Sequence, residues 1–400
     1  MANTLASGPY VQASHRSYQR SDDANNNISW AVADTCQVGP DHHVPCVELT
    51  WERSLTLFEL VKPEKIPEFD DYRVCGDTII AETQMLLKRI EKVVPDNFQP
   101  GGVICLLEDY LSGRVTAFPH FPIENTPVTQ ELYHLLGDYY FKFQYYDKAA
   151  RYYMLDICVN NRRFDAWGGL ALSKASIHSS RLSSLQLDYS SASYEEILRT
   201  SSECYVVYSK ALHLNPYHHT LWVEYGNFAY QTQSYFSRLL KVKTGFHAEA
   251  NAKIQRQKLH FIRLSQQAYF RASQIISANS STSPLSSEEW LQVYMLGKIA
   301  EKTKIDPENA IKYYVKALIC LNAEGAKYPE KIRYQNPSHL SLEVMDVFYR
   351  IHVVVAKWLE SEENYARLSQ KQLVAVLRNI ERRLLWARDT PFAVKELGVG

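Results

Sequence analysis

The stretch Glu131–Tyr153 reads ELYHLLGDYYFKFQYYDKAARYY, and its pattern predicts two helices packed side by side. Several residues in its first half recur every three or four positions, so they share one face of a helix. They are Tyr133, Leu136, Gly137 and Tyr140. Gly137 costs about 1 kcal/mol relative to alanine inside a helix, which indicates close contact with a neighbouring helix. Ala149 and Tyr153 lie on the second predicted helix, on the side that would face the first.

A small residue, an aromatic ring and an alanine at these offsets are typical of the tetratricopeptide repeat (TPR), an antiparallel helix pair of about 34 residues. Similar patterns begin again at Arg163, Leu221 and Glu288. Because recurrence separates a repeat from an ordinary amphipathic helix, the sequence predicts a stacked array. The packing positions predicted in the later repeats are Trp167, Ala171, Tyr208, Ala211, Trp222, Gly226, Tyr269, Ala272, Gly297, Ala310, Tyr314 and Ala317.

The predicted fold is all-α, a right-handed TPR-like helical-repeat solenoid with two long insertions, preceded by a short helical segment and a disordered N-terminus. Its predicted parts are a mobile polar segment at 1–45, a helical segment at 46–112, a proline-rich linker at 113–129, TPR-like repeats at 130–325 and a further helical repeat pair at 326–400. The insertions are expected near 176–200, which is rich in serine, and near 232–260.

Individual helices outside the repeats are predicted where apolar residues keep helical spacing between proline and glycine breaks. They are Val47–Val61, Cys75–Val94 with Asp77 as its cap, Gly101–Leu111, Leu340–Glu360 and Ser369–Arg388. The chain ends without a polar capping helix, so we expect it to belong to a longer array.

Composition limits the classes of function. Lysine plus arginine equal aspartate plus glutamate at 44 each, so no global field attracts nucleic acid or an anionic membrane. No apolar run approaches the ~20 residues of a membrane span. The seven cysteines are odd in number and mostly far apart, which favours a reducing, intracellular compartment.

Sequence motifs for chemistry are missing. The chain contains no G-x-G-x-x-G, P-loop, H-E-x-x-H or G-x-S-x-G motif, so we expect neither an enzyme nor a bound cofactor. Cys36, His42, His43 and Cys46 carry zinc-ligand atoms, but their spacing matches no standard zinc finger. A plain polar loop is the favoured interpretation there, and no metal is expected.

A partner-binding groove is predicted along the outer positions of the first helix of each repeat. The residues expected there are His134, Asp138, Lys142, Asn227, Tyr230, Lys298 and Lys302. Ordinary solvated surface is the alternative for each of them. A carboxylate clamp for chaperone C-termini is disfavoured, because His134 and Gly168 stand where basic or polar clamp residues are needed.

A basic patch is predicted in the second insertion, where Glu249 is the one acidic residue between Thr232 and His260. The basic residues of this patch are Arg238, Lys241, Lys243, Lys253, Arg256 and Lys258. A basic helical surface can bind phosphate or an acidic partner. The alternative is a solvated helix face with no ligand.

Four phrases of the sequence resemble the central region of the calcineurin-binding Cabin family, the animal relative of the yeast histone-regulation scaffold. They are WERSLTLFELVKPEKIPEFDDY at 51–72, ELYHLLGDYYFK at 131–142, YYMLDICVNNRRFDAWGGLALSKAS at 152–176 and HTLWVEYGNFAYQTQSYFSRLLK at 219–241. The phrase LFELVKPEKIPEFD is not a TPR consensus, so it discriminates better than any repeat position.

The resemblance implies a nuclear, non-enzymatic scaffold of the HIRA histone chaperone complex, which acts in replication-independent nucleosome assembly. Its expected partners are other protein subunits of that complex. The family's calcineurin-binding motif, of P-x-I-x-I-T type, does not occur in these 400 residues, so this stretch is not expected to bind the phosphatase. The alternative function is a generic TPR adaptor that binds an extended peptide or helix of a partner.

Overall fold

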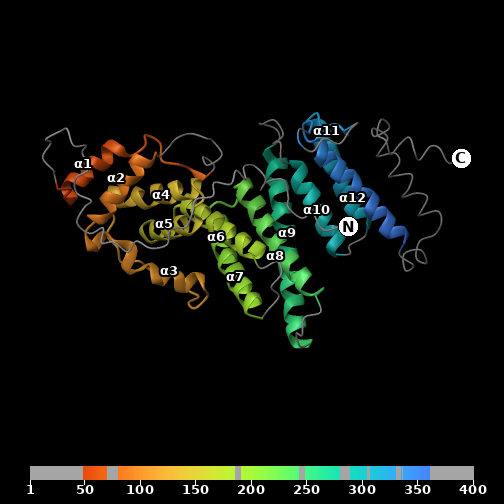
Figure 1. Cartoon of the computed structure of the whole chain (residues 1–400), viewed down its shortest axis with the longest axis horizontal. Helices are drawn as coiled ribbons and strands as arrows, with labels where there is room; N and C mark the ends of the chain where they lie inside the picture. The colour runs from red at the N-terminus through yellow and green to blue at the C-terminus, as the bar shows by residue number, and fades with distance from the viewer. Residues whose placement is uncertain are drawn as a thin grey trace. The chain divides into compact units, whose positions relative to one another are not determined.

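The computed structural model describes residues 48–69, 80–184, 191–242, 248–279, 289–303, 307–329, 335 and 337–360. Regular structure within these ranges is helical throughout, and they contain no strand (Figure 1). The chain divides into two compact units, Met1–Thr50 and Trp51–Gly400, and all that follows concerns the second. The predicted all-α, TPR-like helical-repeat fold is confirmed.

A helical segment precedes the repeats. Its elements are α1 (Trp51–Val61), α2 (Ala81–Lys92), the 3-10 turns Asp96–Phe98 and Pro100–Gly102, and α3 (Ile104–Leu111). Each of these helices starts a few residues later than its apolar pattern predicted. The residue before α2 is Ile80, and its side chain makes no capping hydrogen bond. The expected cap Asp77 lies outside the described residues, as do the four Cys and His residues near position 40 and the helix expected at 369–388.

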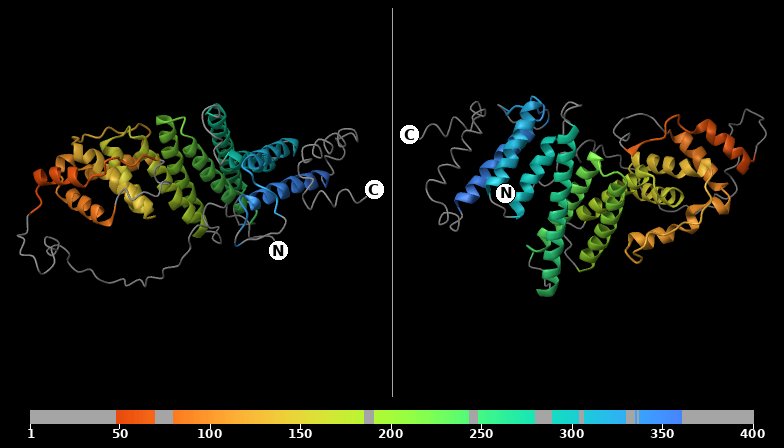
Figure 2. Two further views of the ribbon diagram at one scale, coloured as in Figure 1. Left: turned by 90° about the horizontal axis from the view of Figure 1, so that it is seen from above. Right: turned by 180° about the vertical axis from the view of Figure 1, so that it is seen from behind.

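The repeats are antiparallel helix pairs that follow one another along the chain (Figures 1 and 2). The pairs are α4 (Pro127–Lys142) with α5 (Tyr146–Val159), α6 (Phe164–Ser184) with α7 (Ser191–Leu214), α8 (His219–Leu239) with α9 (Ala248–Asn279), and α10 (Glu289–Thr303) with α11 (Pro307–Ala323). A further helix, α12 (Ser341–Leu359), packs on α11.

The first repeat begins inside the stretch expected as linker. The Thr126 hydroxyl accepts a hydrogen bond from the Thr129 N–H at 3.1 Å, and the Thr129 hydroxyl accepts from the Thr126 N–H at 3.0 Å. Pro127 occupies the first helical position, where its missing N–H costs nothing. This reciprocal cap moves the start of α4 ahead of the Glu131 that the apolar pattern indicated.

Tyrosine rings over glycines join the helices of the repeats. The Tyr153 ring lies between Gly137 and Gly169, where an added Cβ would come within 2.9 Å and 2.3 Å of ring carbons. Tyr269 covers Gly226 and Tyr314 covers Gly297 in the same way. A larger residue at any of these glycines would collide with a buried ring, which is the packing reason for a residue that otherwise weakens a helix.

The predicted packing residues lie in the interior almost without exception. Tyr133, Leu136, Tyr140, Ala149, Tyr153, Trp167, Ala171, Tyr208, Ala211, Tyr269, Ala272, Ala310, Tyr314 and Ala317 are buried, as are Gly137, Gly226 and Gly297. Trp222 is partly buried, and its indole N–H donates to the Pro216 carbonyl at 2.8 Å.

Ala149→Leu is expected to destabilise the fold, because Ala149 is completely buried on α5. Extra methylene groups in a close-packed site cost about 1–3 kcal/mol of the free energy of unfolding. Urea denaturation measures the loss, and Ala252→Leu on the exposed surface of α9 is the control. An unchanged midpoint for Ala149→Leu would contradict the packing of α5 described here.

The residues expected as insertions lengthen the paired helices. The serine-rich stretch near 176–184 continues α6, and residues 191–200 begin α7. Serines tolerate these positions because their hydroxyls donate to the preceding turn, as Ser173 does to the Gly169 carbonyl at 2.7 Å. Likewise α8 and α9 extend across most of 232–260. Phe236 and Ile254 in this stretch are buried, so the apolar faces of the two helices continue through it.

His178 connects three of these lengthened helices. Its Nδ1 is hydrogen-bonded to the Thr200 hydroxyl of α7 at 2.8 Å, and its Nε2 to the Thr232 hydroxyl of α8 at 3.0 Å. The ring is buried, and burial lowers the pKa of His178 to about 3, with a further contribution from Arg181. The imidazole is therefore neutral in the folded protein at physiological pH.

Stability is expected to fall with acidification through His178. Its folded-state pKa lies below the ordinary value of 6.5, so unfolding takes up a proton and the free energy of unfolding drops as pH falls below about 6.5. His178→Gln should remove about 1–2 kcal/mol of the difference in stability between about pH 6.5 and pH 5. If the free energy of unfolding depended on pH in the same way in the unaltered chain and in His178→Gln, as measured by urea denaturation, His178 would not cause the loss of stability.

Candidate functional site

The first helices of the repeats, α4, α6, α8 and α10, together with α12, present the surface on which the partner-binding groove was predicted. We call this surface the first-helix face. Contacts between consecutive first helices link α4 to α6 and α6 to α8. The Lys302 ammonium of α10 donates to the Ser234 hydroxyl of α8 at 3.1 Å, which continues the surface toward the C-terminal repeats.

The N-terminal end of this face is covered by the chain itself. His134 and Asp138 were predicted in an open groove, and this is wrong, because both side chains are buried. The His134 Nε2 atom lies 2.9 Å from the Pro67 carbonyl oxygen. Residues 63–69, which follow α1 and contain no α-helix, therefore lie over α4, and we call them the covering segment.

Phe69 anchors the covering segment on α6. Its ring lies so close to Gly168 that an added Cβ there would come within 2.4 Å of it. The ring makes edge contacts with Phe164 at 5.6 Å and with His218 at 4.9 Å between centroids. The Phe69 N–H donates to the Asp165 carboxylate at 2.8 Å. The covering segment thus occupies the N-terminal end of the first-helix face through Pro67 and Phe69.

A buried cluster of polar and titratable side chains lies beneath this segment. The Arg163 guanidinium contacts Glu131 at 2.9 Å and Asp156 at 3.6 Å, and the His134 Nδ1 lies 4.0 Å from Asp156. Burial raises the pKa of Asp156 to about 8 and lowers that of His134 to about 4. The adjoining pocket is lined by Pro67, Phe69 and Tyr153, and it leaves room for little more than a water molecule. This cluster supports the fold, and its pocket does not accommodate an organic substrate.

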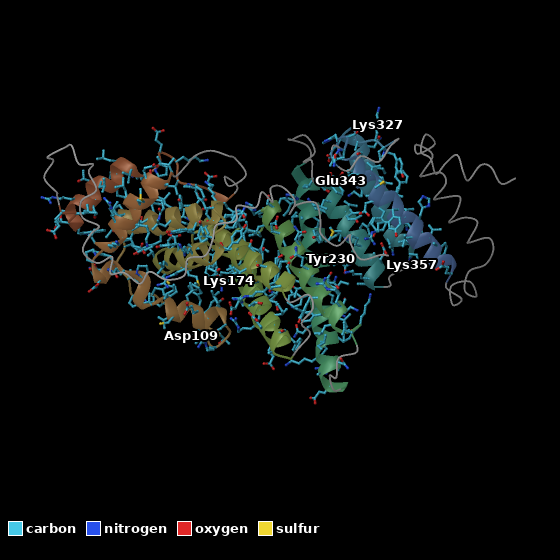
Figure 3. All side chains as sticks on the ribbon, viewed as in Figure 1. Asp109, Lys174, Tyr230, Lys327, Glu343 and Lys357 are labelled. Atoms are coloured by element: carbon cyan, nitrogen blue, oxygen red, sulfur yellow. The ribbon has the colours of Figure 1, made fainter. Side chains whose placement is uncertain are left out.

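The C-terminal part of the first-helix face is different. Tyr230 of α8 lies beneath the ammonium groups of Lys298 and Lys302 of α10, at 5.2 Å and 4.2 Å from its ring centroid (Tyr230 is labelled in Figure 3). Lys298 also lies 5.3 Å from the Tyr294 ring. Cation–π contacts of this kind hold the two ammonium groups together on one surface.

The other residues predicted in the groove lie elsewhere or have internal roles. Asn227 is half-buried, and its side-chain carbonyl accepts from the Tyr269 hydroxyl at 2.6 Å, which fixes the tyrosine over Gly226. Lys142 is ion-paired with Asp138 at 2.9 Å on α4, near the covering segment. The structure therefore brings together Tyr230, Lys298 and Lys302 from the predicted set.

Arg350 of α12 is a functional candidate that the sequence analysis missed. It is half-buried and hydrogen-bonded to the Tyr294 hydroxyl, and it is near enough to Lys298 and Lys302 to lower their pKa values. Its Nε atom is shielded from solvent without a hydrogen-bond partner. The sequence signal that could have identified Arg350 is an arginine inside an otherwise apolar stretch of α12, one turn after Asp346.

Charge repulsion and burial act on the two lysines. Burial, followed by repulsion from Arg350, lowers the pKa of Lys298. Burial, followed by repulsion from Lys298 and Lys258, lowers the pKa of Lys302 to about 7. The Lys302 side chain remains exposed to solvent, so its ammonium is accessible even though protein surrounds it.

The predicted basic patch is divided by the structure. Lys241 and Lys258 lie close enough to Lys302 to lower its pKa, so they belong with the lysines of α10. Arg238, Lys253 and Arg256 are exposed on α8 and α9, and no shared site for them emerges. Lys243 lies outside the described residues. Two residues of the predicted basic patch, Lys241 and Lys258, therefore adjoin the C-terminal part of the first-helix face.

No group of three or more His, Cys, Asp and Glu side chains among the described residues could hold a metal ion. None of the described helices combines the length and apolar character needed to cross a membrane. Cys158 and Cys204 are buried thiols whose pKa burial raises to about 12, whereas Cys105 is exposed.

No known protein-family profile matches this chain. It is similar to a monomeric mutant of IFIT1 with Gppp-AAAA, at 10% identity and a TM-score of 0.29, over 76% of this chain and 62% of that one. It is also similar to the Cut9–Hcn1 hetero-tetramer of APC/C, at 16% identity and a TM-score of 0.16, over 75% of this chain and 54% of that one. The chain spans less than two thirds of the length of either structure.

Proposed function

We propose that this chain is a non-enzymatic TPR-type scaffold of a HIRA-type histone chaperone complex, acting in the nucleus in replication-independent nucleosome assembly. Its helices bind other protein subunits and hold them together, and the chain itself makes and breaks no bond. The helical-repeat fold suits such a role, because stacked helix pairs expose a long surface built from many repeats. The complex itself is proposed from the resemblance of the sequence phrases to the Cabin family.

The observation that carries the scaffold function is the contrast along the first-helix face. Its N-terminal end holds the covering segment through Phe69 and Pro67, with a backbone hydrogen bond to Asp165 and close packing on Gly168. Extended peptides are bound in this manner, through backbone hydrogen bonds and a pocketed side chain. The C-terminal part carries polar and charged side chains that no segment among the described residues covers.

The covering segment also contains part of the sequence on which the resemblance to the proposed family depends most. The phrase LFELVKPEKIPEF, the most discriminating part of the resemblance, contains the residues that lie over α4 and α6. This phrase does not match the repeat consensus, yet its residues pack against the helices of the repeats.

Affinity purification of the tagged chain from nuclear extract, followed by mass spectrometry, tests the proposed complex. We expect subunits of the histone chaperone complex to be recovered, with the Tyr153→Ala variant as a misfolded control that loses them. Reproducible recovery of unrelated partners without any chaperone subunit would reject the proposed complex and favour the generic adaptor.

A further inference from the structure

We propose that the C-terminal part of the first-helix face binds an acidic segment, rich in aspartate and glutamate, of a partner protein. The site consists of Tyr230, Lys298, Lys302 and Arg350, with Lys241 and Lys258 at its edge, and we call it the cationic cluster. This inference rests on the scaffold part of the proposed function and not on the identity of the complex.

The fold neutralises the positive charge of the cationic cluster only in part. Within the described residues, no ion pair engages Lys298, Lys302 or Arg350. Asp346 and Glu301 lie near enough to raise the pKa of Lys298, and each also accepts a hydrogen bond from a tyrosine hydroxyl, Tyr294 and Tyr314 respectively. Incompletely neutralised charges in a partly desolvated place weaken a fold, and an anionic ligand would relieve that cost.

The donors come from separate helices and face one another. Tyr230 belongs to α8, the two lysines to α10, and Arg350 to α12, and all three helices contribute to contacts around Tyr230 and Tyr294. Lys298 and Lys302 are one helical turn apart, so they point in the same direction. The cluster can therefore present at least three cationic groups to successive carboxylates of one chain.

Charge complementarity selects an acidic peptide over nucleic acid. Lys298 and Arg350 are half-buried, so a ligand must reach them with small, flexible anionic groups such as carboxylates. The Tyr230 ring already has both lysine ammonium groups against it, so a base would have to displace these contacts in order to stack there.

The lowered pKa values of the two lysines agree with a binding site for an anionic ligand. Repulsion among the cations contributes to lowering the pKa of each lysine. A bound carboxylate would favour the charged ammonium and reverse that contribution. Residues that cost stability in the free protein are often kept for binding.

Fluorescence anisotropy with a labelled peptide rich in aspartate and glutamate tests the inference. The peptide is about ten residues long and blocked at both ends, so that only side-chain carboxylates are available. We expect Lys298→Gln/Lys302→Gln to weaken binding at least tenfold and Arg350→Gln to weaken it as well. Binding by the unaltered chain should fall at higher ionic strength.

The matched control is Lys312→Gln/Lys316→Gln. These lysines of α11 have the same spacing, and they pair with Glu308 and Glu289 instead of facing the cluster. The control should bind the peptide within twofold of the unaltered chain, and melting curves should show all variants folded. Equal loss in both double variants, or no binding by the unaltered chain at low salt, would overturn the inference.

Two further comparisons separate other ligands. Single-stranded RNA or vesicles of anionic lipid that bind more tightly than the peptide, with the same dependence on Lys298 and Lys302, would overturn the acidic-peptide assignment. If the peptide binds as expected while no histone chaperone subunit does, the cationic cluster stands and the proposed complex fails. The binding of an acidic segment and the identity of the complex are thus tested separately.

Discussion

Replacing Phe69 with alanine is expected to lower the free energy of unfolding by about 3–5 kcal/mol, the usual cost of removing a buried phenylalanine ring. The ring is buried on Gly168 and between Phe164 and His218, so its loss leaves an unfilled space on α6. The covering segment would lose its anchor, and His134 and Asp138 would become accessible. Urea denaturation measures the first effect, and amide hydrogen exchange in α4 and α6 measures the second.

Phe270→Ala is the matched control, because Phe270 lies on the exposed surface of α9. We expect a change within about 0.5 kcal/mol, as for most surface substitutions. If Phe69→Ala were as mild as this control, the covering segment would not be held on the first-helix face.

Tyr153→Ala is expected to cost a similar amount, about 3–5 kcal/mol, for a different reason. Tyr153 is buried on α5 and fills the space between Gly137 of α4 and Gly169 of α6. Because both glycines lack side chains, no neighbouring group can fill the cavity that alanine leaves. The first repeat and its junction with the second should loosen together.

Thermal unfolding monitored by circular dichroism measures the loss, with Tyr217→Ala as the control on an exposed ring. A marginal protein loses several degrees of melting temperature for each kcal/mol, so the variant should melt well below the unaltered chain. Equal melting temperatures for Tyr153→Ala and Tyr217→Ala would contradict the tyrosine-over-glycine packing of the repeats.

The sequence predicts the repeats well because their packing depends on local spacing. Gly137 and Tyr153 belong to adjacent helices of one pair, so their offset is visible in a single stretch. The same holds for Gly297 and Tyr314. The serine-rich stretch near 176–184 was misleading, since serine is read as a helix breaker, whereas here hydroxyls bond within α6 and His178 joins α6 to its neighbours.

The candidate site could be predicted only in part. Tyr230, Lys298 and Lys302 were found because the outer positions of first helices follow from the repeat pattern. The burial of His134 and Asp138 could not be found in this way, because Pro67 and Phe69 reach them from a segment far away in the chain. Arg350 was missed for the same reason, since its partner Tyr294 lies on another helix.

Direct titration tests the proposal that the repeats bind subunits of a histone chaperone complex. Isothermal titration calorimetry of the purified chain against each purified HIRA-type subunit is predicted to give at least one complex with a dissociation constant of about 1 μM or tighter, or roughly −8 kcal/mol. No heat of binding with any subunit, from a chain shown by circular dichroism to be folded, would contradict the claim.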